Sequence, residues 1–253
     1  MSTRFSLETD TYKATTGLPA GNVYSATCWV NIAVIRAAKA TVWALADSST
    51  EGAAGANTLL ITYTDGVSIR LESFGAITSS YTMTADTWYQ LGVVVNGANA
   101  TLYYAPAATA LTAVTVSTFT PPATNGGLWI GRSVWNGEWL NGRIAAFKMW
   151  DAALTQYEIE AELASWDAVR TANLLRVHKF QTAETTDYSG LGNTLTGGIG
   201  ATTDASDPPI STGPPPVMER FAPDAILAQT GLTGAVTAIQ DDPDSPDGSW
   251  LVG

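Results

Sequence analysis

The sequence predicts an all-β fold, a two-layered sandwich with one short helix and an extended C-terminal arm. Three observations carry this prediction. Short runs rich in β-branched and aromatic residues recur between residues 24 and 150 with turn residues between them, which is typical of sandwiches and barrels. One segment, from residue 155 onward, has the start signal and apolar spacing of a helix. After residue 211 the composition becomes proline-rich and acidic.

The predicted strands follow one another along the body of the chain. They lie at residues 24–32, 41–46, 58–64, 67–73, 88–95, 100–105, 111–117, 128–131, 142–150, 174–180 and 194–196. Asp65-Gly66 predicts a two-residue hairpin turn because both residue types tolerate positive φ. The segment Asn96-Gly97-Ala98-Asn99 predicts a second hairpin for the same reason.

Residues 142–150 show the alternation of a strand most clearly. Ile144, Ala146 and Lys148 are expected on one face of this strand, opposite Ala145, Phe147 and Met149. The alternation predicts one packed face and one face toward solvent or a second layer. Tryptophans within the strand patterns are expected in the core: Trp29, Trp43, Trp88, Trp129 and Trp150.

The helix signal begins at Thr155. Thr155 and Glu158 fit a capping box, in which the threonine accepts from the third helical amide and the glutamate reaches back. Ile159, Leu163 and Trp166 then fall on one apolar stripe. We expect a short helix docked on the rim of the sandwich.

Composition excludes several classes of protein. The chain has 253 residues, a formal net charge of −11, 45% hydrophobic residues and 14% charged residues, so it can build a core. The acidic balance argues against a nucleic-acid partner, which requires Lys and Arg. No apolar run is long enough to span a membrane, and the N-terminus has no secretory signal pattern. One cysteine, Cys28, cannot form an internal disulfide and is expected to be a small buried hydrophobe.

A domain boundary is expected near residue 212, with a sandwich at 1–211 and an arm at 212–253. Residues 201–253 hold eight acidic residues and one basic residue, Arg220. A segment of this size cannot bury enough surface to fold alone, so we expect it to dock on another subunit, for example along an exposed strand edge. The residues expected to dock the arm are Asp241, Asp242, Asp244, Asp247 and Trp250.

The sequence contains no recognisable catalytic pattern, and we expect no enzymatic activity. Glycan hydrolysis needs two carboxylates about 5–9 Å apart, one as the acid and one as the nucleophile or base. The one close acidic set, Glu158, Glu160 and Glu162, lies on the predicted helix, where it complements the helix dipole. His178 has no Ser or Cys companion and is expected to pack or cap. A glycanase remains a distant alternative.

Two surface segments are candidate sites. Trp135, Asn136, Glu138 and Trp139 lie in a turn-rich loop, where aromatic faces and polar groups suit a glycan or a protein partner. The alternative is that both tryptophans fix the loop to the sandwich or lie in a subunit interface. Asp187, Ser189 and Asn193 are oxygen-bearing residues that suit calcium, although the same residues form ordinary turns without an ion. No other cofactor is expected.

The order of these features resembles the laminin-G-like type of concanavalin A-like jelly rolls. The motifs are an aromatic-small-x-x-x-W-V strand at 24–30, a W-Y/H-x-x-x-V-V strand at 88–95 followed by Leu102-Tyr103, an L-x-I-G-R strand at 128–132, and a G-x-I-x-x-x-x-x-W-x-x-x-L-T-x-x-E-I block at 142–159. The resemblance implies a jelly-roll sandwich and a lectin-like function. The family's D-x-S-G-x-G-N segment usually comes early, but here it spans 187–193, which implies a permuted order closed by C-terminal strands.

The arm resembles segments of bacteriophage virion proteins, through residues 222–227 and 241–251. This resemblance implies a non-enzymatic virion component, such as a capsid decoration or accessory surface protein. Its expected partners are other virion subunits such as a major capsid protein, further copies of itself and a surface glycan, but no nucleic acid and no membrane. Its expected location is the virion, after synthesis in the host bacterial cytoplasm. The alternative is a carbohydrate-binding module, or a minor tail protein, that recognises a host-surface polysaccharide.

Overall fold

A computed structural model describes most of the body of the chain and two short strands near its C-terminus. The described residues are 1–34, 39–52, 58–64, 68–73, 76–77, 81–122, 124–135, 137–210, 239–241 and 250–252. Contacts divide the chain into a compact unit, Met1–Pro216, and a second unit, Val217–Gly253. In the second unit, β17 (Ile239–Asp241) and β18 (Trp250–Val252) pair antiparallel.

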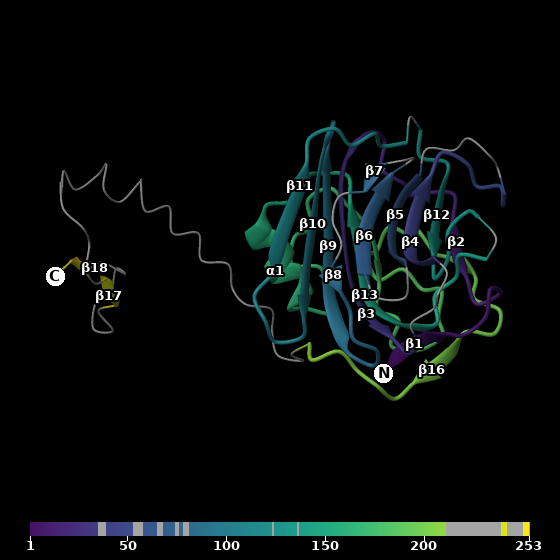
Figure 1. The fold of residues 1–253 in the computed structure, drawn as a ribbon. Helices are drawn as coiled ribbons and strands as arrows, with labels where there is room; N and C mark the ends of the chain where they lie inside the picture. Colours follow the sequence, from purple (N-terminus) through teal and green to yellow (C-terminus); the bar gives the residue numbers. More distant parts are fainter. Residues whose placement is uncertain are drawn as a thin grey trace. The chain divides into compact units, whose positions relative to one another are not determined.

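The compact unit is a sandwich of two antiparallel sheets (Figure 1). Sheet A has the order β11-β10-β9-β3-β13-β1-β16, with β14 also paired to β13. Its strands are β11 (Thr112–Val116), β10 (Asn99–Pro106), β9 (Trp88–Asn96), β3 (Val23–Ile32), β13 (Gly142–Trp150), β1 (Ser2–Phe5), β16 (Thr202–Asp204) and β14 (Leu174–His178).

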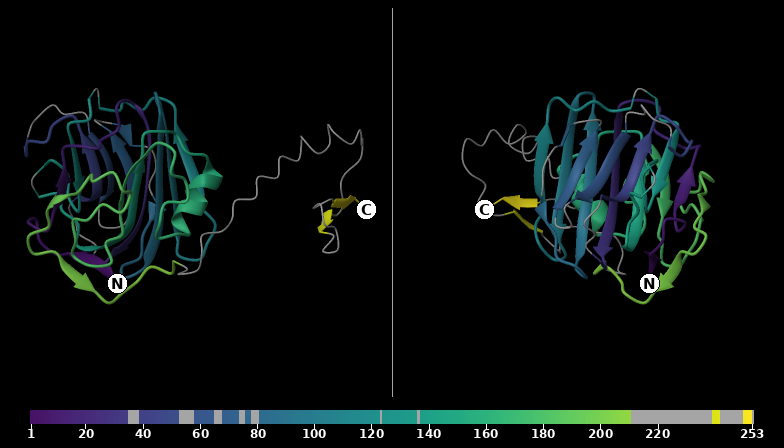
Figure 2. Two further views of the ribbon diagram at one scale, coloured as in Figure 1. Left: turned by 180° about the vertical axis from the view of Figure 1, so that it is seen from behind. Right: turned by 45° about the vertical axis from the view of Figure 1, so that its right-hand side comes forward.

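Sheet B has the order β15-β2-β12-β4-β5-β6-β7, with β8 also paired to β6. Its strands are β15 (Thr196–Gly197), β2 (Tyr12–Ala14), β12 (Gly127–Ile130), β4 (Ala40–Ala46), β5 (Thr58–Thr64), β6 (Ser68–Ser73), β7 (Ala76–Ile77) and β8 (Tyr81–Thr82). The two sheets lie face to face, with the main core between them (Figure 2). The expected all-β sandwich is therefore confirmed.

The long strands agree with the sequence prediction, and most of the short strands were not predicted. The hairpin at residues 96–99 forms with Gly97 at a φ of 63°. The Asp65-Gly66 turn lies outside the described residues, but the flanking β5 and β6 pair antiparallel. Five strands of the compact unit were not predicted: β1, β2, β7, β8 and β16. They have two to four residues each, too few to display a periodic pattern.

C-terminal strands close both sheets. β14 pairs with β13, β16 pairs with the N-terminal β1, and β15 pairs with β2. This is the permuted closure that the late D-x-S-G-x-G-N segment implied. The five strand tryptophans are all buried, as is Cys28.

The predicted alternation along β13 is wrong after Ala145, because the strand contains a bulge. The register with β3 shifts between Ala145 and Lys148, where Ala146 has a φ of 49°. Ile144, Phe147 and Met149 consequently belong to the core between the sheets, while Ala145 and Ala146 lie in a second cluster with Trp150. Both faces of the strand are buried, and Ile144 does not share a face with Lys148. The extra residue reverses the phase of the strand, which a fixed period of two cannot anticipate.

The helix α1 (Gln156–Leu163) begins with the predicted capping box. Thr155 Oγ1 accepts from the Glu158 N–H (3.3 Å), and Glu158 Oε2 accepts from the Thr155 N–H (2.8 Å). The helix lies over the outer face of sheet A, where it contacts β3 and β9 (Figure 2), and not on the rim as expected. Trp166 lies beyond the helix end but still packs against the cluster beneath it.

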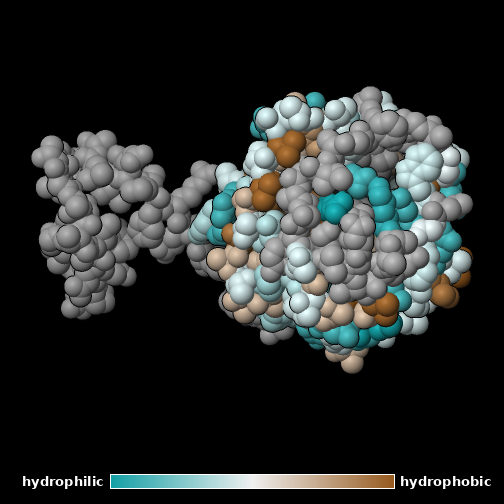
Figure 3. All heavy atoms as spheres, in the orientation of Figure 1, coloured by the Kyte–Doolittle hydropathy of each residue, from teal (hydrophilic) through white to brown (hydrophobic). Residues whose placement is uncertain are grey.

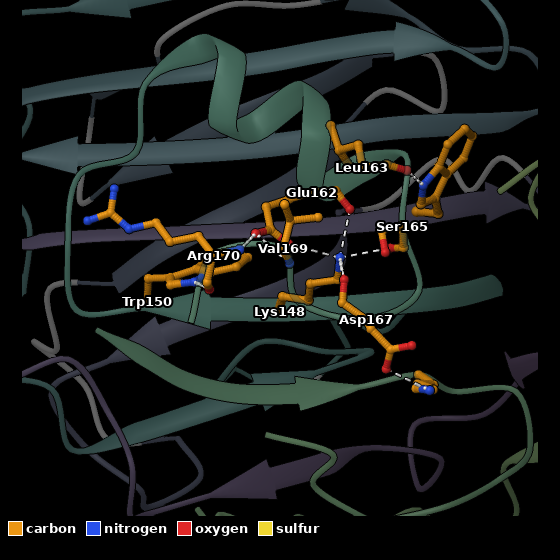
Figure 4. Close-up of polar contacts among 10 residues, drawn as sticks. Lys148, Trp150, Glu162, Leu163, Ser165, Asp167, Val169 and Arg170 are labelled. Carbon is orange, nitrogen blue, oxygen red and sulfur yellow. Dashed lines mark hydrogen bonds and ion pairs between the residues drawn. The ribbon is translucent and has the colours of Figure 1, made fainter. Parts of the chain in front are cut away.

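A buried ammonium group joins this helix to the sheet (Figure 4). Lys148 has no exposed surface and projects from β13 toward the segment that follows α1. Its Nζ donates to the main-chain oxygens of Glu162 (2.7 Å), Ser165 (2.7 Å) and Asp167 (2.8 Å), and lies 3.0 Å from Glu162 Oε2. Burial lowers the pKa of Lys148, and the Glu162 carboxylate opposes this effect.

The Glu162 carboxylate holds the other side of the same segment. Its Oε1 accepts from the backbone N–H groups of Val169 (3.0 Å) and Arg170 (2.6 Å). Trp150 Nε1 in turn donates to the Arg170 carbonyl (2.8 Å), and Trp29 Nε1 to the Leu163 carbonyl (2.8 Å). The irregular segment that follows α1 over sheet A is thus held in place by hydrogen bonds to buried side chains.

His178 packs in the core, as the sequence analysis expected. It has no exposed surface, and its ring lies near those of Phe147 and Phe180, with centroids 6.5 Å and 5.8 Å away. Its Nδ1 lies 2.8 Å from the Thr186 carbonyl, which can only accept, so Nδ1 carries the proton of a neutral imidazole. Burial lowers the pKa of His178 to about 4.

Replacing Lys148 with Met is expected to lower the free energy of unfolding by about 3–5 kcal/mol, because Glu162 then remains buried without its cationic partner. Denaturant unfolding followed by tryptophan fluorescence measures this loss. The matched control is Lys179→Met, which breaks the ion pair with Asp167, whose side chain is 69% exposed. That change is expected to cost less than about 1 kcal/mol. Equal effects of the two substitutions would contradict a central role for Lys148.

His178 is expected to make the fold sensitive to mild acid. Its pKa is lower in the folded state than the value of about 6.5 in an unfolded chain, so stability is lost as the pH falls from about 6.5 to 4. The free energy of unfolding is expected to decrease by an amount on the order of 3 kcal/mol across this range. Denaturant unfolding at several pH values measures it.

The comparison is with His178→Phe, which keeps an aromatic ring but does not titrate. The chain has one histidine, so no other imidazole contributes in this pH range. The variant is expected to lose much less stability between pH 6.5 and 4, with a small loss toward pH 4 from carboxylates such as Asp187, even though it loses the hydrogen bond to Thr186. The same slope in both proteins would show that His178 is not the titrating group.

Candidate functional site

The outer face of sheet B carries a small cluster that we call the Trp129 patch: Lys13, Ala44, Ala46, Trp129, Val134 and Trp135. The sheet register builds it, because Trp129 of β12 lies beside Lys13 of β2 and beside Ala44 of β4. Small alanines on β4 leave room for the indole, which is buried. The Lys13 ammonium lies 4.4 Å from the centroid of the Trp129 ring and donates to the Ser49 carbonyl.

Arg132 joins three loops at the border of this patch. Its side chain is 8% exposed, and its Nη2 lies 3.0 Å from Glu51 Oε1 and 3.7 Å from Glu8 Oε1. Glu8 Oε1 also accepts from the Gly137 N–H (2.7 Å). These contacts hold the Glu8 and Glu51 carboxylates in place. Both carboxylates still face solvent, because the two side chains are 41% and 50% exposed.

The loop that follows β12 is held by its own hydrogen bonds. Ser133 Oγ donates to Glu138 Oε2 (2.6 Å) and accepts from the Trp135 N–H (2.9 Å). The Leu140 N–H donates to the Gly131 carbonyl (2.8 Å), and Gly137 has a φ of 82°. Trp139 forms isolated backbone bridges with Thr41 and with Arg132. The loop is thus anchored at both ends.

The structure describes three of the four predicted contact residues, all in this loop. Trp135 and Trp139 are each partly exposed, Glu138 is partly exposed within the same loop, and Asn136 lies outside the described residues. Trp135 packs against the other apolar members of the patch and is itself partly exposed, so it both fixes the loop and stays accessible. Binding through these residues stays a prediction.

Sequence reasoning missed the charged residues that border the loop. Glu8, Lys13 and Glu51 come from loops or strands far away in the chain and carry no local motif. Arg132 closes the L-x-I-G-R motif, which marked its strand without indicating that its guanidinium binds two carboxylates. These residues meet only because β2, β4 and β12 are neighbours in the sheet.

Asp187, Ser189 and Asn193 form a self-contained turn after β14. Asp187 Oδ1 accepts from the N–H groups of Val177 and Ser189, both at 3.0 Å. Its Oδ2 accepts from Ser189 Oγ and from the Asn193 N–H, both at 2.7 Å. Burial alone would raise the pKa of Asp187, but these hydrogen bonds outweigh it and lower that pKa. Backbone and hydroxyl donors therefore account for the turn.

The side chain of Asn193 also stabilises this turn, since its Nδ2 donates to the Leu175 carbonyl (2.8 Å). Among the residues that the structure describes, no group of three or more His, Cys, Asp or Glu side chains is arranged to hold a metal ion. Calcium at this turn stays a prediction.

Of the predicted docking residues in the arm, Asp241 ends β17 and Trp250 begins β18. Asp242, Asp244 and Asp247 lie outside the described residues. Within the described part of the chain, no helix is long and apolar enough to cross a membrane.

Comparisons with known proteins agree with this architecture. Residues 7–160 match Laminin_G_3, described as the concanavalin A-like lectin/glucanases superfamily. A crystal structure from Bacteroides ovatus ATCC 8483, whose protein is named as a candidate for carbohydrate binding, is 15% identical with a TM-score of 0.51. The match covers 81% of this chain and 60% of that one.

The enzymatically active domain of tailspike protein 2 from bacteriophage CBA120 is 8% identical, with a TM-score of 0.51 over 66% of this chain and 28% of that one. At such identities the likeness concerns the fold. No curated protein sequence matches significantly. The family match covers more than half of the chain, and the structure is a sandwich of two antiparallel sheets. The chain therefore belongs to the Laminin_G_3 family of the concanavalin A-like lectin/glucanases superfamily.

Proposed function

We propose that this protein binds carbohydrate without cleaving it, through the Trp129 patch and the loop that follows β12. The observation that carries this proposal is the partly exposed Trp135 on a loop fixed by Ser133 and Gly131, beside solvent-facing carboxylates. The lectin-like fold and the Bacteroides ovatus structure named for carbohydrate binding support it.

The surface has the groups that sugar recognition requires. The apolar C–H face of a pyranose ring stacks on an indole, and its hydroxyls donate to carboxylates. Glu8 and Glu51 supply such acceptors, and Arg132 holds both in place before any ligand arrives. A site that is ordered in advance loses less conformational entropy on binding.

The carboxylates of this surface have structural partners that account for their positions. Glu8 and Glu51 bind Arg132, and Glu138 accepts from Ser133. Hydrolysis would require one carboxyl group as an acid and a second as nucleophile or base across a bound sugar. In a binding role, the same carboxylates act only as fixed hydrogen-bond acceptors, so they do not need separate acid and base roles.

Trp135→Ala is expected to weaken glycan binding at least about fivefold, because truncating a central aromatic contact costs about 1–3 kcal/mol. A glycan array identifies the sugar for the wild-type protein, and isothermal titration calorimetry measures the affinity of each variant. The matched control is Tyr157→Ala, since Tyr157 is 58% exposed on α1, over the other sheet. The proposal fails if no glycan binds, or if both variants bind as tightly as the wild type.

A second candidate function is that of a bacteriophage virion component, either a capsid decoration protein or a minor tail protein. The observations that favour it are the acidic arm, which resembles virion proteins, and the fold shared with a tailspike domain. In this role the arm, through Asp241, Asp242, Asp244, Asp247 and Trp250, would attach the sandwich to a multi-copy lattice. Many weak contacts then sum through avidity.

Deleting residues 213–253 is expected to abolish co-sedimentation with purified phage particles assembled without this protein, while the full chain sediments with them. The deletion leaves the compact sandwich unit nearly whole. Trp135→Ala is the control here, because it should change glycan binding and leave particle binding intact. Particle binding that survives the deletion would exclude the arm as the attachment.

A further inference from the structure

Within the described residues, the main strand order of the two sheets ends in four terminal strands, and three of them are protected. β7 and β15 have two residues each, so they offer little backbone for pairing. β16 has three residues and ends in Asp204, whose Oδ2 lies 3.0 Å from Arg143 Nε and 3.8 Å from Arg4 Nη1. Short strands and edge charges are the ordinary means by which sheets avoid pairing with other chains.

The fourth edge, β11, lacks this protection. It has five residues, Thr-Ala-Val-Thr-Val, and it pairs with β10 on one side. Within the described residues, no strand lies on its other side. β-branched residues suit a strand, and a five-residue edge leaves alternate N–H and C=O groups directed away from the sheet.

Like an inner strand of the sandwich, β11 has one face that packs on the core and one outer face. Val114 and Val116 pack against the core between the sheets but remain partly exposed. Ala113 and Thr115 are exposed on the outer face, where Thr115 Oγ1 lies 2.8 Å from Thr101 Oγ1 of β10. A further strand beside β11 would complete the burial of both valines.

The charge pattern around this edge is unlike that of the rest of the chain. Residues 87–131, which contain β9, β10, β11 and β12, include no Asp, Glu, Lys, Arg or His, although the chain has a net charge of −11. In Figure 3 the region where Figure 1 shows β10 and β11 is drawn mainly in pale and brown tones. Burial and the charge of Glu160 on α1 raise the pKa of Tyr103 on β10, one strand inside the edge.

We propose that β11 is a self-association edge, along which two copies of this chain pair antiparallel about a two-fold axis near Val114. Such pairing joins the two A sheets into one continuous sheet. It places Val114 near its own copy and Ala113 near Thr115, and two valines from each chain extend the core. An isologous contact of this kind requires a surface that is complementary to itself, which a neutral alternating strand provides.

Charge favours a second copy over a basic partner. A basic partner would find no acidic side chain on β9, β10 or β11 to attract it. Two copies with a net charge of −11 repel each other over most of their surface, and this neutral edge lets them approach without opposing like charges.

Sedimentation equilibrium of the full chain tests the proposal, at protein concentrations from about 1 to about 500 µM, a range that covers weak and standard interfaces. The wild type is expected to dimerise. Thr115→Glu is expected to raise the dimer dissociation constant at least tenfold, since it places a carboxylate in the pairing edge of each copy. Thr115 is exposed, so circular dichroism should show an unchanged fold.

The matched control is Thr202→Glu, which adds the same charge to an exposed threonine on β16, at the opposite edge of sheet A. It is expected to leave the dimer intact. A wild type that stays monomeric throughout overturns the proposal. So does a dimer that survives Thr115→Glu, or one that is lost equally with both variants.

Single cysteines along β11 identify the occupant of the edge. The native Cys28 is buried, so only the introduced cysteine is available to form a disulfide between two copies. With each of positions 112–116 changed to cysteine in turn, one position near Val114 is expected to form a symmetric disulfide dimer under mild oxidation. If another segment of a second copy occupied the edge, no position would crosslink to itself, and the two-fold pairing would be excluded.

Discussion

The buried ammonium of Lys148 is the contact on which the architecture of sheet A depends. A fully buried charge requires partners for all its donors, and Lys148 finds three main-chain oxygens and one carboxylate oxygen. Those oxygens belong to α1 and to the irregular chain that follows it, so one side chain positions both. The β13 bulge makes this contact possible, because the extra residue turns Lys148 toward the outer face.

The two outer faces of the sandwich consequently differ. Over sheet A, α1 and the following segment bury Trp29, Trp150 and Ile159 in a second core. On sheet B, the described residues form a much smaller cluster around Trp129, bordered by Lys13 and Arg132. The first face is closed by packing and buried polar contacts, whereas the second keeps partly exposed aromatic and charged groups. This difference is why the proposed glycan site lies on sheet B.

Polar residues that look functional in isolation serve the fold in several places. Asp187 orders the turn after β14 with four hydrogen bonds, and His178 is a neutral core residue between two phenylalanines. The helix acids divide in the same way, since Glu158 caps α1 and Glu162 binds Lys148. The burial of each side chain and its hydrogen-bond or ion-pair partners distinguish these roles, and the local sequence predicts neither.

Local patterns were enough to predict the sandwich, the long strands, the Thr155 capping box and the buried tryptophans, because each depends on residues close together in the chain. The bulge at Ala146, the place of α1 over sheet A and the five short strands that were not predicted emerge only in the folded molecule, since their stability comes from distant neighbours. The same holds for the site: Trp135 and Glu138 lie in one loop, but Lys13, Glu51 and Arg132 meet there through sheet register. Register is set by hydrogen bonds between strands remote in sequence, which a local pattern does not encode.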